Sequence, residues 1–356
     1  MAKQKYYSLK NILKENAEYN LLLGERSNGK SYATKEYCVR KAYENGTCFG
    51  YLRRYNMDVK ASKVETYFAD CPVTSITKGE YSYISVYRGR IYLANIDENG
   101  KTKRGQIIGH TFDLSGAEHY KSLSYQNDSS ITDIIFEEFV TSNGYLQNEP
   151  RELMQLVSTI ARREKIQVWL IGNTVNRTCP YFYEWELRNI PKQKQGTIEM
   201  YKQKTNQIND DGTPLIIKIA VEFCENSGKN SKMFFGKAGE SITSGVWETK
   251  EYPNISDVKN YEIIYSLLLE YQGFNFSVNL CLGDNLFVYV YPNSHKKYER
   301  VISQNFSTSY LKSCKLNRNI KAEQKIIELM QLNKICYSDN LTASDFNATL
   351  LDFNIF

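Results

Sequence analysis

Residues 21–35 read LLLGERSNGKSYATK, and this stretch decides the fold. An apolar run that is typical of a buried strand ends at Gly24, and Gly29-Lys30-Ser31 follows after four residues. The residues from Lys30 to Gly46 predict a helix that ends at a glycine. A G-x-x-x-x-G-K-[ST] motif between a strand and a helix is the signature of a phosphate-binding loop. The stretch therefore predicts that the chain binds ATP or GTP.

In such a loop, backbone N–H groups and the helix N-terminus surround the phosphates. Lys30 is expected to reach the β- and γ-phosphates, and the Ser31 hydroxyl is expected to ligate Mg²⁺. The candidate nucleotide-binding residues are Gly24, Glu25, Arg26, Ser27, Asn28, Gly29, Lys30, Ser31 and Tyr32.

A second buried strand ends in two acids, in the sequence ITDIIFEE of residues 131–138. In ATPases of the ASCE class, one acid holds the water shell of Mg²⁺ and the next activates the attacking water. Glu137 is expected to take the first role, where aspartate is usual, and Glu138 the second, as general base. An exposed acid pair that has no chemical role is the alternative interpretation.

A third apolar strand is predicted at residues 166–171, and Asn173 follows it. At the carboxyl end of a strand, Asn173 is placed to sense the γ-phosphate or the attacking water, or it is an ordinary turn residue. A helix that precedes this strand ends at Arg162-Arg163. One interpretation is that these two cations stabilise the C-terminus of the helix. The other is that one of them is an arginine finger for a neighbouring subunit.

The composition narrows the class of protein without identifying it. The 356 residues carry a net charge of +5, which permits nucleic acid as a partner. The 28 tyrosines suit strands, and base stacking is the less favoured interpretation. The eight cysteines form no C-x-x-C pair, which indicates reduced thiols. We expect a soluble, intracellular protein without a signal peptide or membrane span.

An ordered set of motifs resembles the genome-packaging motor ATPases, or encapsidation proteins, of small tailed bacteriophages of the Picovirinae-type podoviruses. The motifs are GERSNGKSYATK, YLRRY, KSLSY, IIFEEF, YLQNEPRELMQLVSTIARRE and LIGNT. The resemblance implies ATP-driven translocation of double-stranded DNA into a preformed prohead by a homomeric ring, usually a pentamer. The implied partners are the phage portal and prohead and a structural RNA, with no membrane. The implied location is the host cytoplasm, with transient attachment to the prohead and absence from the mature virion.

The resemblance also assigns basic residues. Arg162 matches the trans-acting arginine finger, and Arg163 lies next to it. Lys121 matches a basic residue that the family places near the subunit interface and the pore. Arg53 and Arg54 match the R-R-Y that follows the second strand, residues 47–53.

An antiparallel hairpin set is predicted before the acidic strand, in residues 81–114. Lys101, Lys103 and Arg104 lie at or beside one of its tips. Contact with the DNA backbone is one interpretation of these charges, and ordinary solvated loop residues are the other.

Three domains are predicted. Residues 1–197 form an α/β P-loop ATPase domain of the ASCE class, with a central, mostly parallel sheet flanked by helices. Residues 198–255 form a polar linker or lid, and residues 256–356 form an RNase H-like domain with three antiparallel strands followed by helices. The first of these strands offers Glu270, but the region lacks paired acids at convincing positions, so we expect a vestigial nuclease without cutting activity that docks DNA, RNA or the portal.

Two other functions agree with the same residues. One is a P-loop DNA translocase or helicase that acts away from capsids. The other is a nucleotide-gated DNA-binding or assembly protein with little turnover, which the glutamate at position 137 keeps open. A metabolic P-loop kinase is disfavoured, because the sequence shows no acceptor-site motif.

Overall fold

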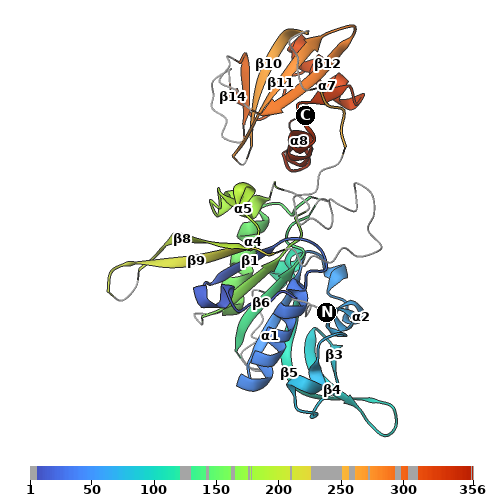
Figure 1. The fold of residues 1–356 in the computed structure, drawn as a ribbon, viewed down its shortest axis with the longest axis vertical. Coiled ribbons are helices and arrows are strands. Elements are labelled where there is room, and N and C mark those ends of the chain that lie inside the picture. The colour runs from blue at the N-terminus through green and yellow to red at the C-terminus, as the bar shows by residue number, and fades with distance from the viewer. Residues whose placement is uncertain are drawn as a thin grey trace, which may run out of the picture. The chain divides into compact units, whose positions relative to one another are not determined.

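The structure of the chain is a computed structural model. It describes residues 6–120, 130–141, 144–161, 165–174, 177, 179–208, 211–225, 251–255, 261–271, 273–292, 298–303, 312–353 and 355. The chain divides into two compact units, and the second includes residues Ser142–Tyr145 and Val175–Arg188 besides Trp247–Phe356. Each unit is built on its own sheet (Figure 1).

The described residues of the first unit form a nine-stranded sheet in the order β3-β4-β5-β2-β6-β7-β1-β9-β8. The strands are β1 (Tyr19–Leu23), β2 (Cys48–Arg53), β3 (Tyr83–Tyr87), β4 (Arg90–Ile96), β5 (Thr102–Asp113), β6 (Ile131–Glu137), β7 (Gln167–Ile171), β8 (Thr197–Ile208) and β9 (Pro214–Phe223). From β5 to β9 all neighbours are parallel, and antiparallel hairpins extend both edges. The strand before Asn173 lies between the strand before the phosphate loop and the acidic strand, which is the ASCE arrangement.

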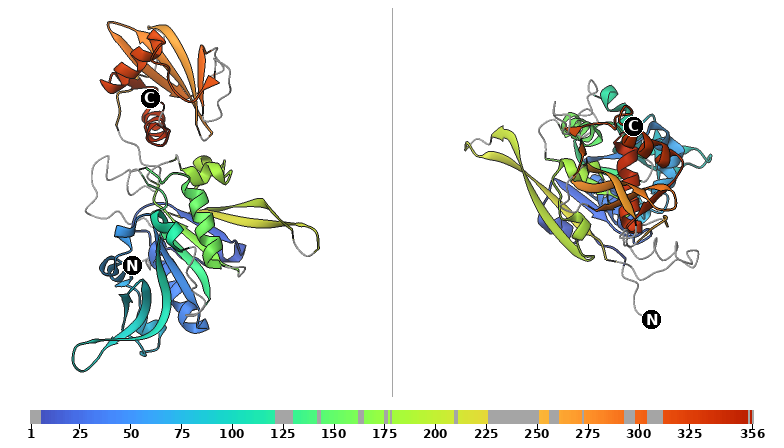
Figure 2. Two further views of the ribbon diagram at one scale, coloured as in Figure 1. Left: turned by 180° about the vertical axis from the view of Figure 1, so that it is seen from behind. Right: turned by 90° about the horizontal axis from the view of Figure 1, so that it is seen from above.

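Helices cover both faces of this sheet. Helix α1 (Lys30–Asn45) packs on β2, β5, β6 and β7 on the face shown in Figure 1, whereas α4 (Glu149–Ala161) packs on β6 and covers the face shown in the left view of Figure 2. Gly46 ends α1 in a left-handed conformation, with its N–H bonded to the carbonyl of Ala42, as predicted. The other helical elements among the described residues of this unit are η1 (Ile12–Glu15), η2 (Asn56–Asp58), α2 (Ala61–Phe68), α3 (Val73–Ile76), η3 (Leu114–Tyr120) and η4 (Ile190–Lys192).

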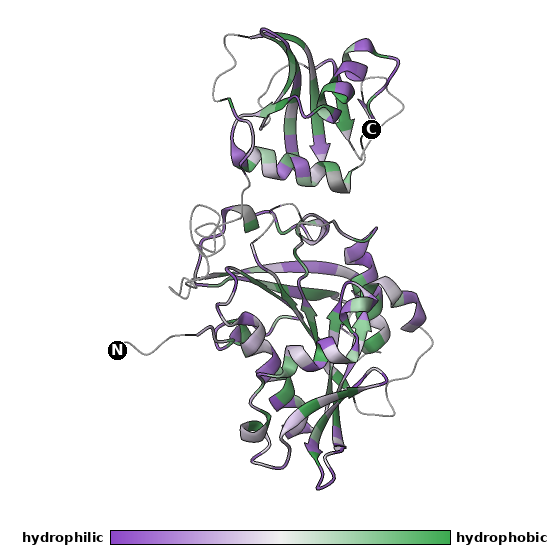
Figure 3. Cartoon of the chain, turned by 90° about the vertical axis from the view of Figure 1, so that its right-hand side faces the viewer, coloured by the Kyte–Doolittle hydropathy of each residue, from purple (hydrophilic) through white to green (hydrophobic). Residues whose placement is uncertain are grey.

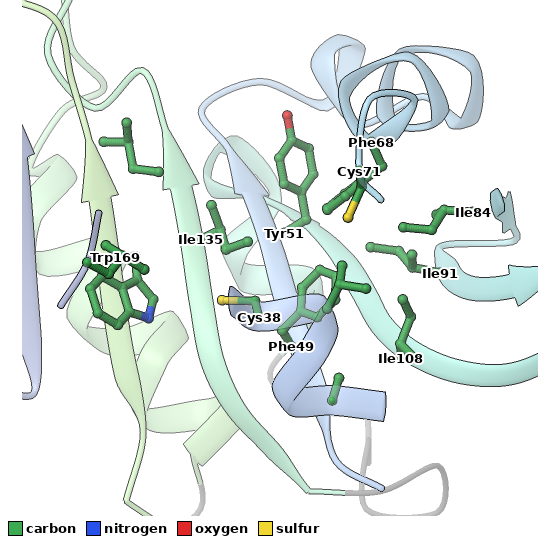
Figure 4. Close-up of a cluster of buried hydrophobic side chains, with 14 of the residues drawn as sticks. Cys38, Phe49, Tyr51, Phe68, Cys71, Ile84, Ile91, Ile108, Ile135 and Trp169 are labelled. Carbon is green, nitrogen blue, oxygen red and sulfur yellow. The ribbon is translucent and has the colours of Figure 1, made fainter. Parts of the chain in front are cut away.

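The core of the first unit lies between α1 and the sheet. Phe49, Tyr51, Ile135 and Trp169 come from three neighbouring strands and form one buried cluster with Cys38 of α1, and each is at most 2% exposed (Figure 4). Burial of each large apolar side chain contributes about 1.5–3 kcal/mol. The strands at the centre of the sheet are predominantly hydrophobic (Figure 3), as expected for parallel strands covered on both faces. This packing fixes the strand ends that carry the site.

The predicted boundary at residue 197 is wrong, because residues 197–223 complete the first sheet. Strand β9 is parallel to β1, and its residues Ile219 to Phe223 are buried. Strand β8 has only β9 as a neighbour, and most of its residues are exposed or half-buried. The polar sequence that suggested a linker is therefore that of a solvated edge hairpin.

The second unit contains a six-stranded sheet in the order β14-β13-β10-β11-β12-β15. Its strands are β10 (Glu262–Tyr271), β11 (Phe274–Leu282), β12 (Leu286–Pro292), β13 (Arg300–Ser303), β14 (Lys312–Ser313) and β15 (Ile335–Tyr337). The helices in the described part of this unit are α5 (Pro180–Glu184), α7 (Lys321–Gln331) and α8 (Asn340–Asp352). The predicted three antiparallel strands followed by helices are confirmed. The RNase H-like assignment stays a prediction.

All eight cysteines are free thiols, and six are buried. Among the described residues, no helix has both the length and the apolar character needed to span a membrane. The same part of the chain contains no group of three or more His, Cys, Asp or Glu side chains that could hold a metal ion.

Candidate ATPase active site

One row of residues across the first sheet aligns the predicted functional groups. Leu22 of β1 is level with Ile171 of β7, and Ile171 is level with Glu137 of β6. Because these strands are parallel, the segments that follow these positions all leave the sheet at its carboxyl edge. The phosphate loop, Glu138 and Asn173 therefore lie at this edge, as the sequence predicted.

The phosphate loop curls between β1 and α1 through three residues with positive φ. These are Gly24 at 148°, Ser27 at 62° and Gly29 at 97°, and Ser27 accepts a conformation that usually falls to glycine. Two backbone hydrogen bonds fix the base of the loop, since the N–H of Gly172 donates to Leu22 and that of Thr174 donates to Gly24. Arg26 and Ser27 are exposed, whereas Glu25 and Asn28 are buried.

The Lys30 ammonium lies inside this loop. Its Nζ donates to the carbonyl oxygen of Glu25 at 2.6 Å and to Oδ1 of Asn28 at 3.2 Å. Burial lowers the pKa of Lys30, and the nearby Cys224, Glu137 and Glu25 act in the opposite direction. The ammonium is thus held by loop oxygens that phosphate oxygens can replace.

Glu137 ends β6 and is buried beside the start of α1. The hydroxyl of Tyr67, on α2, donates to Glu137 Oε1 at 2.6 Å, and the Ser31 hydroxyl also hydrogen-bonds to this carboxylate. Burial raises the pKa of Glu137, and these two hydrogen bonds act against the increase. The structure thus brings together Ser31 and Glu137, the two predicted metal-site residues.

Glu138 differs from Glu137 in both exposure and backbone conformation. Its φ is 57°, and 65% of its side chain is exposed. Its carboxylate accepts a hydrogen bond at 2.6 Å from the Arg53 guanidinium at the end of β2. A left-handed non-glycine residue stores conformational strain, and such strain concentrates at functional sites.

Arg54 anchors the turn that carries Glu138. Its guanidinium makes two hydrogen bonds to the buried carboxylate of Glu149, at 2.7 and 2.8 Å, and donates to the carbonyls of Glu138 and Phe139. Arg54 is only 6% exposed. Its prediction as a DNA or interface contact is therefore corrected: the guanidinium is already engaged inside the fold.

Asn173 is half-buried directly after β7, at the level expected of a sensor residue. Tyr32, in the first turn of α1, is 38% exposed. Both residues lie at the predicted edge, and the roles assigned to them stay predictions.

The basic hairpin tip lies at the amino end of β5, on the side of the sheet opposite its carboxyl edge. Lys101 closes the turn that begins at Asp97, while Lys103 and Arg104 belong to β5. Strand β5 is parallel to β2, with Asp113 level with Arg53 at the site. Arg104 lies nine positions before Asp113, which corresponds to roughly 30 Å along the strand. The guanidinium of Arg104 lies 4.7 Å from the centre of the Tyr87 ring.

Three predicted residues, Arg162, Arg163 and Lys121, lie outside the described residues. Conversely, the structure adds Tyr67 and Tyr7, neither of which belongs to a motif. Tyr67 contacts Glu137 from 70 residues away, and Tyr7 contacts Glu222 from 215 residues away. No local spacing signals contacts of this kind.

Comparison with known proteins places this chain in a family. A model described as Podovirus DNA encapsidation protein (Gp16) matches residues 1–213. The DNA packaging protein of Bacillus phage B103 is 29% identical over 255 residues, covering 64% of this chain and 73% of the relative. That of Bacillus phage phi29 is 27% identical over 274 residues, covering 69% and 76%.

The fold agrees with a solved structure, the viral genome packaging motor assembly of bacteriophage Phi-29. It superimposes with a TM-score of 0.55 and 21% identity, covering 94% of this chain and 95% of the other. At 21% identity, this likeness shows a shared fold and no more. Family membership is shown by the family model, which matches more than half of the sequence. The chain belongs to the podovirus DNA encapsidation protein family.

Proposed function

We propose that this chain hydrolyses ATP to move double-stranded viral DNA into a preformed prohead, as a subunit of a homomeric ring. Membership of the DNA encapsidation family supports the packaging role. The observation that carries the ATPase assignment is the single carboxyl edge that holds Lys30, the Ser31–Glu137 pair and Glu138. Convergence of charged groups, two of which (Lys30 and Glu137) are buried, is typical of catalytic sites.

ATP binding uses groups that are already positioned. The loop and the first turn of α1 offer backbone N–H donors, and the helix N-terminus favours anions. On binding, the Lys30 ammonium exchanges Glu25 and Asn28 for phosphate oxygens. This exchange offsets the cost of keeping an ammonium buried.

Ser31 and Glu137 suit a magnesium site, because Mg²⁺ prefers oxygen ligands and keeps several of its waters. The Ser31 hydroxyl would bind the ion and Glu137 would hold its water shell. Glutamate is one methylene longer than the usual aspartate, and Tyr67 fixes the orientation of its carboxylate. Bound Mg²⁺ would neutralise charge on the β- and γ-phosphates.

Glu138 is the proposed general base. In the structure its carboxylate is bound to Arg53, so it must leave this guanidinium to accept a proton from water. Arg53 is thus expected to hold the base away from the site when hydrolysis is not required. Asn173 is proposed to orient the water or the γ-phosphate from the neighbouring strand.

The ring and its partners rest on the family resemblance. Arg162, with Arg163 beside it, is proposed to reach the site of the neighbouring subunit, and Lys121 to lie near the interface and pore. Lys101, Lys103 and Arg104 are proposed DNA contacts, which their exposure permits. The subunit number is proposed to be five, with docking on the phage portal and a structural RNA in the host cytoplasm, and with release before the virion matures.

The second unit is proposed to be a vestigial nuclease domain that docks DNA, RNA or the portal. Its antiparallel strands β10 to β12 support this interpretation. Glu270, the acid that a nuclease site would use here, is paired with Lys312 at 3.1 Å. Such a pairing is consistent with a structural role for this acid.

The direct test of this proposal is a DNA-packaging assay. Wild type, with proheads, double-stranded DNA and ATP, should render DNA resistant to DNase, whereas Glu138→Gln should not. DNA-stimulated ATPase without DNA protection would instead support a translocase that acts away from capsids. Negligible turnover by wild type under all conditions would support a nucleotide-gated binder.

Subunit mixing tests the shared site. Arg162→Ala and Glu138→Gln should each lack turnover alone. If the finger acts in trans, a mixture regains activity at interfaces where intact Arg162 faces intact Glu138. Full activity of Arg162→Ala alone would remove the finger from the proposal.

A further inference from the structure

A segment near the N-terminus crosses the phosphate loop. The backbone N–H of Tyr7 donates to the carbonyl oxygen of Asn28 at 3.2 Å. The segment also lies close to Gly29, because a Cβ on that glycine would be 3.5 Å from Tyr7 N and 3.6 Å from the Tyr6 ring. The loop is therefore covered by main chain and an aromatic side chain that belong to no loop motif.

The Tyr7 side chain fastens this segment to the sheet. Its hydroxyl donates to Glu222 Oε2 at 2.7 Å, and burial raises the pKa of Tyr7, which keeps the donor proton in place. Glu222 lies in β9, level with Leu22 of β1. The N–H of Cys224 then donates to the carbonyl of Leu23 at 2.8 Å. The hydrogen bonds from Tyr7 to Asn28, from Tyr7 to Glu222 and from Cys224 to Leu23 thus link the phosphate loop to β9 and β9 to β1. We call this set of contacts the circuit.

The loop residue held by this circuit is Asn28. Its Oδ1 accepts hydrogen bonds from the backbone N–H and from the ammonium of Lys30, both at 3.2 Å. Asn28 is 1% exposed, and within the described structure its Nδ2 has no partner. Fixing the Asn28 carbonyl therefore also fixes the group that positions Lys30 before ATP arrives, and leaves one buried donor facing the loop.

We infer that Tyr7 is a positioning residue for nucleotide binding, which holds the phosphate loop in its binding geometry by joining Asn28 to Glu222. This inference rests on the proposed ATP site. A loop that is already ordered loses less conformational freedom on binding, so the circuit increases affinity rather than the chemical rate. Without it, only a fraction of the free protein has the loop in the competent form.

The test compares two tyrosine–glutamate hydrogen bonds of the first unit. Tyr7→Phe removes the hydroxyl at the loop, and Tyr43→Phe removes a hydroxyl that donates to Glu80 at 2.8 Å on the surface. The probe is an ATP analogue with a fluorescent ribose substituent, titrated with Mg²⁺ into the full chain. We expect Tyr7→Phe to weaken binding about three- to tenfold, since tenfold corresponds to about 1.4 kcal/mol, the upper range for one hydrogen bond of ordinary strength. Tyr43→Phe should bind like wild type.

A second set of variants separates positioning from a loss of folding. Glu222→Gln keeps an acceptor and should bind like wild type, whereas Glu222→Leu should match Tyr7→Phe. The double variant Tyr7→Phe/Glu222→Leu should be no weaker than Glu222→Leu alone, because both changes break one circuit. Protein that is irreversibly unfolded lowers the amplitude of a titration and leaves its midpoint unchanged. For Tyr7→Phe, KM for ATP should increase while kcat stays within about twofold.

Two results would overturn the inference. One is a Tyr7→Phe affinity equal to that of Tyr43→Phe, and the other is a loss in kcat with an unchanged KM. Failure of wild type to bind the analogue would instead overturn the proposed ATP site. The two proposals are therefore tested separately by one titration series.

Discussion

Both units contain a buried ion pair, but the first unit also buries charged side chains against neutral groups. In the first unit, Lys30 and Glu137 are held by neutral groups, the loop oxygens and two hydroxyls. In the second unit, Arg300 and Glu323 are buried against each other at 3.3 Å. Neutral partners can be displaced by a phosphate or a metal, whereas an internal ion pair neutralises itself. Chemistry is therefore expected at the first unit's carboxyl edge and structural support in the second unit.

Breaking one buried ion pair in each unit gives the largest expected effect. Arg54→Met leaves the Glu149 carboxylate buried without its cation. Glu323→Leu leaves the Arg300 guanidinium buried without its anion. Each should destabilise its unit by about 3–5 kcal/mol. Urea unfolding of the full chain measures this loss.

The rate of ATP turnover then distinguishes the Arg54–Glu149 pair from the Arg300–Glu323 pair. Arg54→Met should also lose ATPase activity in the folded protein, because Arg54 holds the carbonyls of Glu138 and Phe139 in the turn that carries the proposed base. Glu323→Leu should keep it. Loss of turnover in both variants, under conditions where both are folded, would contradict the division of roles.

Removing one lysine from each unit should give the next largest effect. Lys30→Ala removes the cation of the phosphate loop and should reduce ATP turnover at least about a hundredfold. Lys312→Ala, which removes the partner of Glu270, is the matched control and should turn over like wild type. Steady-state phosphate release measures both, and equal rates would rule out the loop as the active site.

The pH dependence of the second unit should reveal a buried acid. Burial raises the pKa of Asp345 from 3.8 to about 6, although Arg177 lies 3.9 Å away. The contribution of the protonated form to stability is thus complete below pH 3.8 and is lost as the pH rises through 6. Asp345→Asn should therefore stabilise the unit by about 3 kcal/mol at pH 8 and have almost no effect near pH 4.

Urea unfolding of wild type and Asp345→Asn at both pH values checks this sign. A variant that is less stable than wild type at pH 8 would mean that the Arg177 ion pair outweighs the burial cost.

The smallest predicted effect concerns one hydroxyl in each unit. Tyr67→Phe removes the donor to Glu137 and should reduce turnover about tenfold at limiting Mg²⁺, as loss of an outer-shell partner does. Tyr265→Phe removes a comparable donor to Glu323 and should leave turnover unchanged. A Mg²⁺ titration of ATPase activity measures both. If excess Mg²⁺ gives Tyr67→Phe no recovery, Tyr67 does not act through the metal site.

The sequence predicts those parts of the site that depend on local pattern. The phosphate loop, the acidic strand and Asn173 each follow an apolar run, so their places at strand ends could be deduced without the fold. Burial of Arg54 could not, because it depends on Glu149, 95 residues away. The role of Tyr7 depends on Glu222 in the same way.

The boundary of the first sheet shows a different limit. Hydrophobic periodicity identifies β9 poorly, because only its second half is buried, and β8 is exposed along most of its length. A solvated edge hairpin and a polar linker have similar compositions, and only strand pairing separates them.

The most direct test of the account is ATP turnover by wild type and Glu138→Gln, each with and without double-stranded DNA. The account predicts that DNA stimulates wild type, and that Glu138→Gln binds ATP normally but turns over about 10²–10⁴-fold more slowly. Turnover by Glu138→Gln at the wild-type rate, or wild-type turnover that is indifferent to DNA, would contradict it.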